Sequence, residues 1–287
     1  MNMDLCITTL VEDTTLDGGL LAEHGLSFWI EYGDKRILFD TGQSDILVRN
    51  AKILGINLND VDAIVLSHGH YDHTGGLSTI PDIALKARIY LHPTATEPKF
   101  SRKTSGAESI GMPYLAKKAV QKGHVVWTAI PAQIFPGISV TGQVPRINNF
   151  EDVGGAFFVD ENYKKPDELL DDQTVFIETD KGLVVVLGCA HSGVVNVLEY
   201  ISNLTRRNKI YAVIGGMHLL NASEERIERT ITAFRKYDVQ KIGLAHCTGA
   251  NAFQRFSDTF KERCFTCSAG MNISFEKSQK QFCYEIK

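Results

Sequence analysis

The sequence of 287 residues lacks an apolar run long enough to cross a membrane, and Met1-Asn2-Met3-Asp4 lacks the character of a secretory signal. Its six cysteines are scattered rather than spaced as a disulfide framework. A structural zinc site normally needs four ligands, and Cys264, Cys267 and Cys283 supply only three. We therefore expect ordinary thiols there. Positive charge is not in excess either, because the net charge is −4. We therefore expect a cytoplasmic protein without a membrane or nucleic-acid partner.

What the sequence does contain is the alternation of apolar runs and amphipathic segments that is typical of an α/β protein. Residues 26–32 and 36–39 predict a hairpin that turns at Gly33-Asp34-Lys35, and residues 61–66 predict a buried strand. Further strands are predicted at 5–10, 87–91, 125–128, 138–141, 174–178, 183–187, 210–214 and 241–245, and helices at 44–54, 112–122, 193–204, 223–236 and 252–262. A sandwich of two mixed sheets with outer helices reconciles the hairpin-rich start with the βαβ units of the second half. No repeat or linker divides the chain, so we expect a single domain over residues 1–287.

A dense group of potential metal ligands follows the strand predicted at 61–66. Four of them, His68, His70, Asp72 and His73, lie within six residues, and nearby glycines let the backbone bend. A turn at the carboxyl end of a buried strand directs such side chains into one pocket, where imidazole and carboxylate suit zinc, iron or manganese. Gathering so many ionisable groups is costly without a cation, so this pattern predicts a metal site.

The pattern His-x-His-x-Asp-His after an apolar strand resembles the signature of the metallo-β-lactamase superfamily. This resemblance implies an αββα sandwich with the active site at one edge of the sheets. It also implies two divalent metal ions, with zinc as the first expectation and iron or manganese as alternatives. His68 and His70 would then hold the first ion, and Asp72 and His73 the second.

Other parts of the family pattern are present, with one departure. Asp40, in Phe39-Asp40-Thr41-Gly42, matches an early aspartate that supports the ligand loop by hydrogen bonding, although a turn-forming aspartate would look the same. His246, after the strand at 241–245, resembles the last motif and is expected to bind the second ion. Where the family usually has a bridging aspartate, this chain has Gly188-Cys189-Ala190-His191. Either Cys189 replaces the carboxylate as a thiolate, or His191 completes the first site, which we favour.

Two further motifs resemble a narrower group within the superfamily. Gly215-Gly216-Met217-His218 offers a metal ligand, a proton donor or an oxyanion stabiliser, although a helix-capping role is an alternative. Glu23-His24-Gly25 lies in a polar loop that brings His24 toward the strand ends, where we expect a substrate contact. The narrower group includes dihydropterin-methyl-ribofuranosylaminobenzene 5′-phosphate synthases and uncharacterised metal-dependent hydrolases.

The resemblance implies an enzyme that acts on a small molecule. We expect a hydrolase whose two ions generate a hydroxide that attacks an ester, lactone, amide or phosphoester, with Asp72 orienting the nucleophile and His218 taking part in catalysis. The synthase activity, which transfers a pterin with loss of diphosphate, is the alternative. A non-catalytic metal-binding protein and a di-iron oxygen-reducing protein are further alternatives.

Residues 94–123 form a segment longer than is needed to connect the strands on either side of it. We expect this segment to be a lid-like insertion. It carries the basic residues Lys99, Arg102, Lys103, Lys117, Lys118 and Lys122. We expect residues 101–112 to form a mobile loop and the helix at 112–122 to hinge over the metal pocket. Arg102 and Lys103 would then bind an anionic group such as phosphate. A solvated helix face is the alternative.

Overall fold

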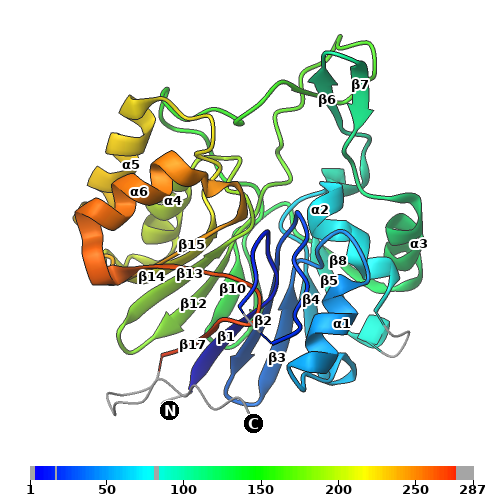
Figure 1. The fold of residues 1–287 in the computed structure, drawn as a ribbon, viewed down its shortest axis with the longest axis horizontal. Helices are drawn as coiled ribbons and strands as arrows, with labels where there is room; N and C mark the ends of the chain where they lie inside the picture. Colours follow the sequence, from blue (N-terminus) through cyan, green and yellow to red (C-terminus); the bar gives the residue numbers. More distant parts are fainter. Residues whose placement is uncertain (1–3, 17, 81–83, 276–287) are drawn as a thin grey trace.

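The computed structural model describes residues 4–16, 18–80 and 84–275. Two seven-stranded sheets pack face to face, and helices cover the outer face of each (Figure 1). The predicted αββα sandwich with two mixed sheets is therefore confirmed. Cys283 lies outside the described residues.

The first sheet has the strand order β17-β1-β2-β3-β4-β5-β8. Its strands are β1 (Leu5–Val11), β2 (Ser27–Tyr32), β3 (Lys35–Phe39), β4 (Ala63–Val65), β5 (Arg88–Leu91), β8 (His124–Trp127) and β17 (Asn272–Ser274). Pairing is antiparallel from β17 to β3 and parallel from β3 to β8. The predicted hairpin joins β2 and β3, and Gly33 takes a φ of 60° in its turn, a value that favours glycine.

The second sheet has the order β16-β15-β14-β13-β12-β10-β9. Its strands are β9 (Ala132–Phe135), β10 (Ile138–Val140), β12 (Val175–Thr179), β13 (Gly182–Leu187), β14 (Ile210–Gly216), β15 (Lys241–Ala245) and β16 (Cys264–Thr266). Pairing is antiparallel from β9 to β13 and parallel from β13 to β16. Both sheets thus combine an antiparallel half with a parallel half, an arrangement that no sequence repeat had indicated.

The helices lie in two layers, with α1 and α3 on the first sheet and α4, α5 and α6 on the second (Figure 1). Their bounds are α1 (Ile46–Ile53), α2 (Tyr71–Thr74), α3 (Tyr114–Lys122), α4 (Val194–Thr205), α5 (Glu224–Lys236) and α6 (Ala250–Phe260). In α5, the Ser223 hydroxyl caps the helix by accepting from the backbone N–H of Arg226 at 3.2 Å. Within the described ranges, no helix combines the length and the apolar character needed to span a bilayer.

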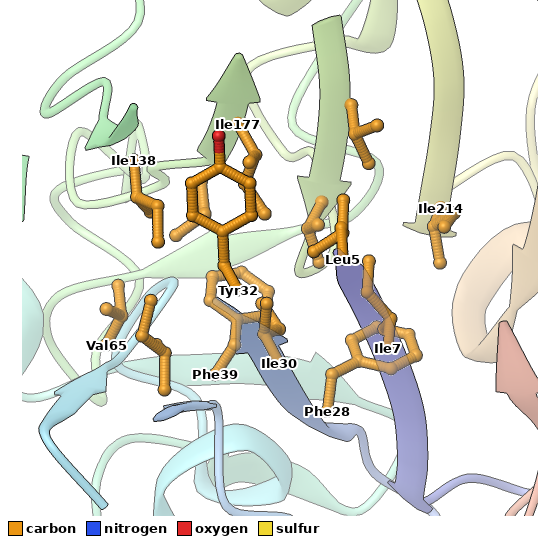
Figure 2. Packing of buried hydrophobic residues seen from close by; sticks show 14 of the residues in the cluster. Leu5, Ile7, Phe28, Ile30, Tyr32, Phe39, Val65, Ile138, Ile177 and Ile214 are labelled. Carbon is orange, nitrogen blue, oxygen red and sulfur yellow. The ribbon is translucent and has the colours of Figure 1, made fainter. Parts of the chain in front are cut away.

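The core is divided into three apolar layers. The central layer lies between the sheets, where Phe28, Ile30 and Phe39 of the first sheet face Ile138 and Ile177 of the second (Figure 2). One outer layer joins the first sheet to α1 and α3, and the other joins the second sheet to α4, α5 and α6. Packing of the two sheets thereby fixes the distance between the strand ends of the first sheet and those of the second.

A third, small sheet projects from the sandwich (Figure 1). Its order is β11-β6-β7, with β6 (Phe100–Lys103), β7 (Gly106–Ser109) and β11 (Phe157–Phe158). Within residues 101–112, where a mobile loop was expected, β6 and β7 form a hairpin. The helix expected to hinge over the site is α3, and it buries Ala116, Ala119 and Val120 against the first sheet. The projecting part of the insertion is therefore the hairpin.

Replacing Phe28 with alanine should lower the free energy of unfolding by about 3–5 kcal/mol, because a fully buried ring between the sheets leaves a cavity. The matched control is Leu115→Ala on α3, where the side chain is 62% exposed and little should change. Urea unfolding curves of both variants measure the difference. Equal midpoints for the two variants would contradict this account of the core.

Candidate metal centre

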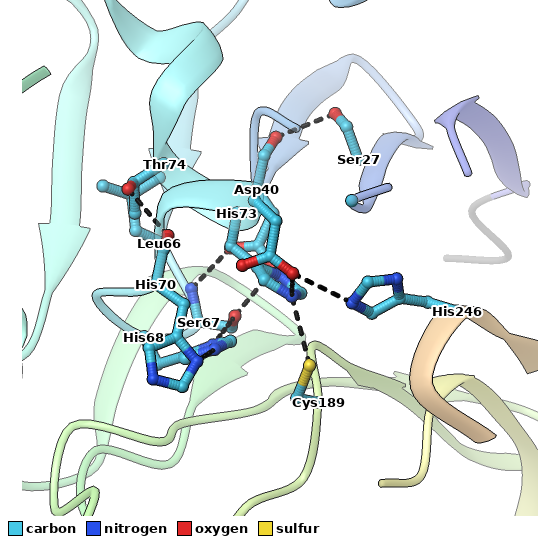
Figure 3. A network of polar contacts seen from close by, with 12 residues as sticks. Ser27, Asp40, Leu66, Ser67, His68, His70, His73, Thr74, Cys189 and His246 are labelled. Atoms are coloured by element: carbon cyan, nitrogen blue, oxygen red, sulfur yellow. Dashed lines mark hydrogen bonds and ion pairs between the residues drawn. The ribbon is translucent and has the colours of Figure 1, made fainter. Parts of the chain in front are cut away.

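The predicted ligand turn lies between β4 and α2, as a strand-to-helix turn (Figure 3). The chain packs tightly there against neighbouring backbone. A Cβ on Gly69 would lie 2.0 Å from the carbonyl oxygen of Ala95, and one on Gly76 would lie 2.0 Å from that of Thr41. Only glycine permits these approaches.

The first cluster of donor atoms combines two histidines of the turn with His191, which follows β13. The Nε2 atom of His68 lies 2.9 Å from Nδ1 of His70. The ring centroid of His191 lies 4.8 Å from that of His68 and 4.9 Å from that of His70. Nδ1 of His191 donates to the carbonyl oxygen of Val153 at 2.8 Å, which leaves Nε2 available.

The second cluster combines Asp72 and His73 with His246, which follows β15. Oδ2 of Asp72 lies 3.2 Å from Nε2 of His246 and 3.7 Å from Nε2 of His73. The second sheet thus brings His191 to one cluster and His246 to the other.

Asp40 lies directly behind the turn, fully buried. Its carboxylate accepts from the backbone N–H of Ser67 at 2.6 Å, from the Ser67 hydroxyl at 2.7 Å and from Nδ1 of His73 at 2.7 Å. This is the hydrogen-bonding support expected of a residue that orients a metal-binding imidazole.

Cys189 lies between the two clusters. Its sulfur is 3.1 Å from Nε2 of His73, and it groups with His68 and His73 as one possible donor set. Burial raises the pKa of this thiol well above its usual value. From the sequence, Cys189 and His191 are alternatives for the same role, but the structure brings both side chains to the donor clusters. Ala190 lies between them with a φ of 53°, and this turn of the backbone lets both side chains reach the same region.

His218 follows β14 and lies beside the first cluster. Its ring centroid is 4.2 Å from that of His191, and its Nε2 donates to the carbonyl oxygen of Gly154 at 3.3 Å. Its nitrogen also lies within 4.8 Å of the sulfurs of Cys189 and Cys247. His218 therefore stands next to the centre, behind His191.

Two acidic residues outside the predicted site, Glu12 and Asp13, hold the segment of His246. The backbone N–H of His246 donates to the Glu12 carboxylate at 2.7 Å, and its Nδ1 lies 2.9 Å from Oδ1 of Asp13. Nδ1 of His24 lies 3.3 Å from the other oxygen of Asp13. An Asp in a polar loop carries no distinguishing signal, so only the fold reveals this role.

These donors fit divalent cations. Among the described residues, Nε2 of His70 and Nε2 of His191 are buried without a hydrogen-bond partner. Burial lowers the pKa of His68 and His191 well below the usual value and that of His70 to about 3, so all three rings are neutral near pH 7. Burial alone would raise the pKa of Asp72, but the nearby His73 and His246 lower it. The neutral imidazoles of the first cluster and the ionised carboxylate of Asp72 are donors that zinc and iron bind. At the second cluster, burial lowers the pKa of His246, but hydrogen bonds to Asp13 and Asp72 raise it well above its usual value, so a cation would displace a proton there.

Phe157 of β11 forms an apolar wall beside the first cluster, and no sequence motif indicates this role. Its ring centroid lies 5.3 Å from that of His70 and 5.6 Å from that of His191. A backbone bridge also pairs His70 with Gly111. The small sheet is therefore attached to the ligand turn.

Arg102 and Lys103 both lie on β6 of this small sheet. The guanidinium of Arg102 stacks 4.9 Å from the ring centroid of Phe158 and 4.5 Å from that of Tyr163. The ammonium of Lys103 lies 3.6 Å from the carboxylate of Glu108 across the hairpin.

Lys99 differs from its basic neighbours because it points inward, with 2% of its side chain exposed. Its ammonium lies 2.9 Å from Oδ1 of Asp171 and 3.0 Å from Oδ2 of Asp167. The other oxygen of Asp171 accepts from the backbone N–H of Gly69 at 2.7 Å. Lys99 is therefore not part of an exposed positive cluster, and it ties the insertion to the ligand turn.

Comparison with known protein families agrees with the sandwich fold. A model described as the metallo-beta-lactamase superfamily matches residues 21–203, which is more than half of the chain. The protein belongs to the metallo-β-lactamase superfamily and is an enzyme. Members typically bind divalent metals and act on small-molecule substrates.

Two relatives are similar over nearly the whole chain. One is 7,8-dihydropterin-6-methyl-4-(beta-D-ribofuranosyl)-aminobenzene-5′-phosphate synthase of Methanocaldococcus jannaschii, 37% identical over 94% of this chain and 96% of its own length. The other is a solved structure, Tm1679, described as a metal-dependent hydrolase of the β-lactamase superfamily. It has a TM-score of 0.82 and 30% identity, and it covers 95% of this chain and 100% of its own. YhfI from Bacillus subtilis, with a TM-score of 0.58 and 14% identity, shares the fold alone.

Replacing Lys99 with methionine should lower the free energy of unfolding by about 3–5 kcal/mol, because two buried carboxylates lose their cation. Lys103→Met removes an ion pair whose lysine side chain is 54% exposed, and it should cost at most about 1 kcal/mol. Urea unfolding of both variants provides the comparison. Similar small losses in the two would show that the buried network does not stabilise the fold.

Proposed function

We propose that this enzyme is a two-metal hydrolase. His68, His70 and His191 would hold the first divalent cation, and Asp72, His73 and His246 the second. The observation that carries the proposal is the adjacency of two separate donor clusters on either side of Cys189. Zinc is the first candidate for both ions, with iron and manganese as alternatives.

Bound cations supply Lewis acidity, which makes a water molecule more acidic and stabilises negative charge that develops on the substrate. Asp72 has its carboxylate at the second cluster, where it orients the attacking water and accepts its proton. His218 lies beside His191 and donates a proton to the leaving group. Phe157 shields the first cluster from bulk water.

The substrate is a small molecule with an ester, lactone, amide or phosphoester bond. Arg102 and Lys103 on the projecting hairpin are the proposed contacts for an anionic group such as phosphate. The free thiols of Cys189 and Cys267 support a reducing, cytoplasmic setting.

A second candidate is the synthase activity, because the 37% identical relative of that name aligns over 94% of this chain. In that reaction an arylamine nitrogen attacks a pterin methyl diphosphate, and diphosphate leaves. The same two clusters would serve it, since bound cations also stabilise a departing diphosphate.

Turnover should require metal and both clusters. Purified protein is loaded with Zn²⁺, Mn²⁺ or Fe²⁺ and assayed on nitrophenyl esters, nitrophenyl phosphodiesters and lactones. It is also assayed on the pterin methyl diphosphate with and without the arylamine ribotide. His68→Ala and His246→Ala should each lower turnover at least about a thousandfold while leaving the apo fold intact, because each removes one metal ligand. The control is His124→Ala, an exposed residue of β8.

The outcomes separate the two candidates. Hydrolysis without the arylamine supports the hydrolase, and diphosphate release that depends on the arylamine supports the synthase. Activity that survives a strong chelator, or full activity in either ligand variant, would rule out both.

His191→Ala should weaken binding of the first cation by about tenfold or more, and Cys189→Ser by less. The reason is that imidazole is a strong neutral donor, whereas burial keeps the Cys189 thiol protonated. Competition with a chromogenic chelator for Zn²⁺ measures both affinities. The opposite order would favour Cys189 as a bridging thiolate.

A further inference from the structure

His24 occupies a place at the second cluster that closely matches that of His246. Nε2 of His24 lies 3.4 Å from Oδ2 of Asp72, and Nε2 of His246 lies 3.2 Å from the same oxygen. The two imidazole rings are neighbours, with centroids 4.7 Å apart. Both rings therefore direct the same nitrogen at one carboxylate oxygen.

These separations fit atoms that bind one ion. Zinc–nitrogen and zinc–oxygen bonds of 2.0–2.2 Å at tetrahedral angles place donor atoms about 3.3 Å apart. The distances from Oδ2 of Asp72 to Nε2 of His24 and of His246 are close to this value. His73 is slightly farther from the same oxygen, at 3.7 Å.

A single carboxylate holds both rings in this orientation. Oδ1 of Asp13 lies 2.9 Å from Nδ1 of His246, and Oδ2 of Asp13 lies 3.3 Å from Nδ1 of His24. Oδ1 of Asp13 also accepts from the backbone N–H of Gly25 at 3.2 Å, which fixes the carboxylate to the His24 loop. Metal-binding histidines commonly donate their other N–H to such a carboxylate, which sets the tautomer and the direction of the lone pair.

The loop of His24 is itself anchored in the fold. A Cβ on Gly25 would lie 2.4 Å from the carbonyl oxygen of Asp72, so the two segments are in backbone contact. The N–H of Leu26 also donates to that carbonyl oxygen at 3.3 Å. His24 is therefore positioned by the same turn that carries Asp72.

We propose that His24 is a ligand of the second divalent cation, and that Asp13 positions both His24 and His246 for that ion. The second site would then have the donors Asp72, His73, His246 and His24, one more histidine than the sequence motifs predict for it. The inference rests on the proposed two-metal function, and it replaces the expectation that His24 contacts substrate alone. Because 56% of the His24 side chain is exposed, this ligand stands at the open side of the site.

The test is Zn²⁺ binding by His24→Ala, measured as metal content per chain and by competition with a chromogenic chelator. The variant should keep the first Zn²⁺ with wild-type affinity and bind the second at least about tenfold more weakly. Asp13→Asn should weaken the second Zn²⁺ as well, because an amide has one acceptor oxygen for two imidazole N–H groups. The absorption spectrum of the Co²⁺-loaded protein should also change in His24→Ala, since one nitrogen donor is lost.

His124→Ala removes an exposed histidine of β8 and should bind metal as the wild type does. Thermal unfolding of the metal-free proteins checks that the His24 and Asp13 variants remain folded. If His24→Ala retains wild-type affinity for both ions and an unchanged Co²⁺ spectrum, the inference is wrong. If such a variant also shows a raised KM, His24 is a substrate contact instead of a metal ligand. A wild-type protein that holds fewer than two Zn²⁺ would overturn the proposed function together with this inference.

Discussion

Both oxygens of the fully buried Asp40 carboxylate accept hydrogen bonds from the ligand turn. A buried carboxylate without such partners would cost several kcal/mol, so the turn is stable only when folded around it. Asp40 also takes a φ of 57°, a strained conformation for a residue other than glycine. Three hydrogen bonds offset this strain, and they fix His73 and the start of the turn together. The geometry of both donor clusters depends on this arrangement.

The sandwich supplies the remaining donors because both sheets present the carboxyl ends of parallel strands at one edge. The ligand turn follows β4 in the first sheet. His191 follows β13 and His246 follows β15, which are parallel strands of the second sheet. The apolar layer between the sheets holds these ends at a fixed separation. Core packing therefore sets the distance between the candidate donors of the first sheet and those of the second.

The protein orients its donor imidazoles by binding their second nitrogens. His68 is held by the Ser67 hydroxyl, His191 by the carbonyl oxygen of Val153, and His246 by Asp13. This support sets the directions in which the remaining ring nitrogens point, and a fold of this kind does not by itself decide the substrate. The small sheet adds an apolar side chain to this region, because Phe157 borders the first cluster.

The sequence by itself determined the ligand turn, the β2–β3 hairpin and the long helices, because each is encoded by residues close together in the chain. Periodicity placed every end of the five long helices within two residues. Only the tertiary structure decided that Cys189 and His191 both reach the centre, that Lys99 points inward, and that Asp13 holds His246 across 233 positions of sequence. Contacts between such distant residues have no local pattern, since they exist only once the two sheets have packed and their strand ends meet.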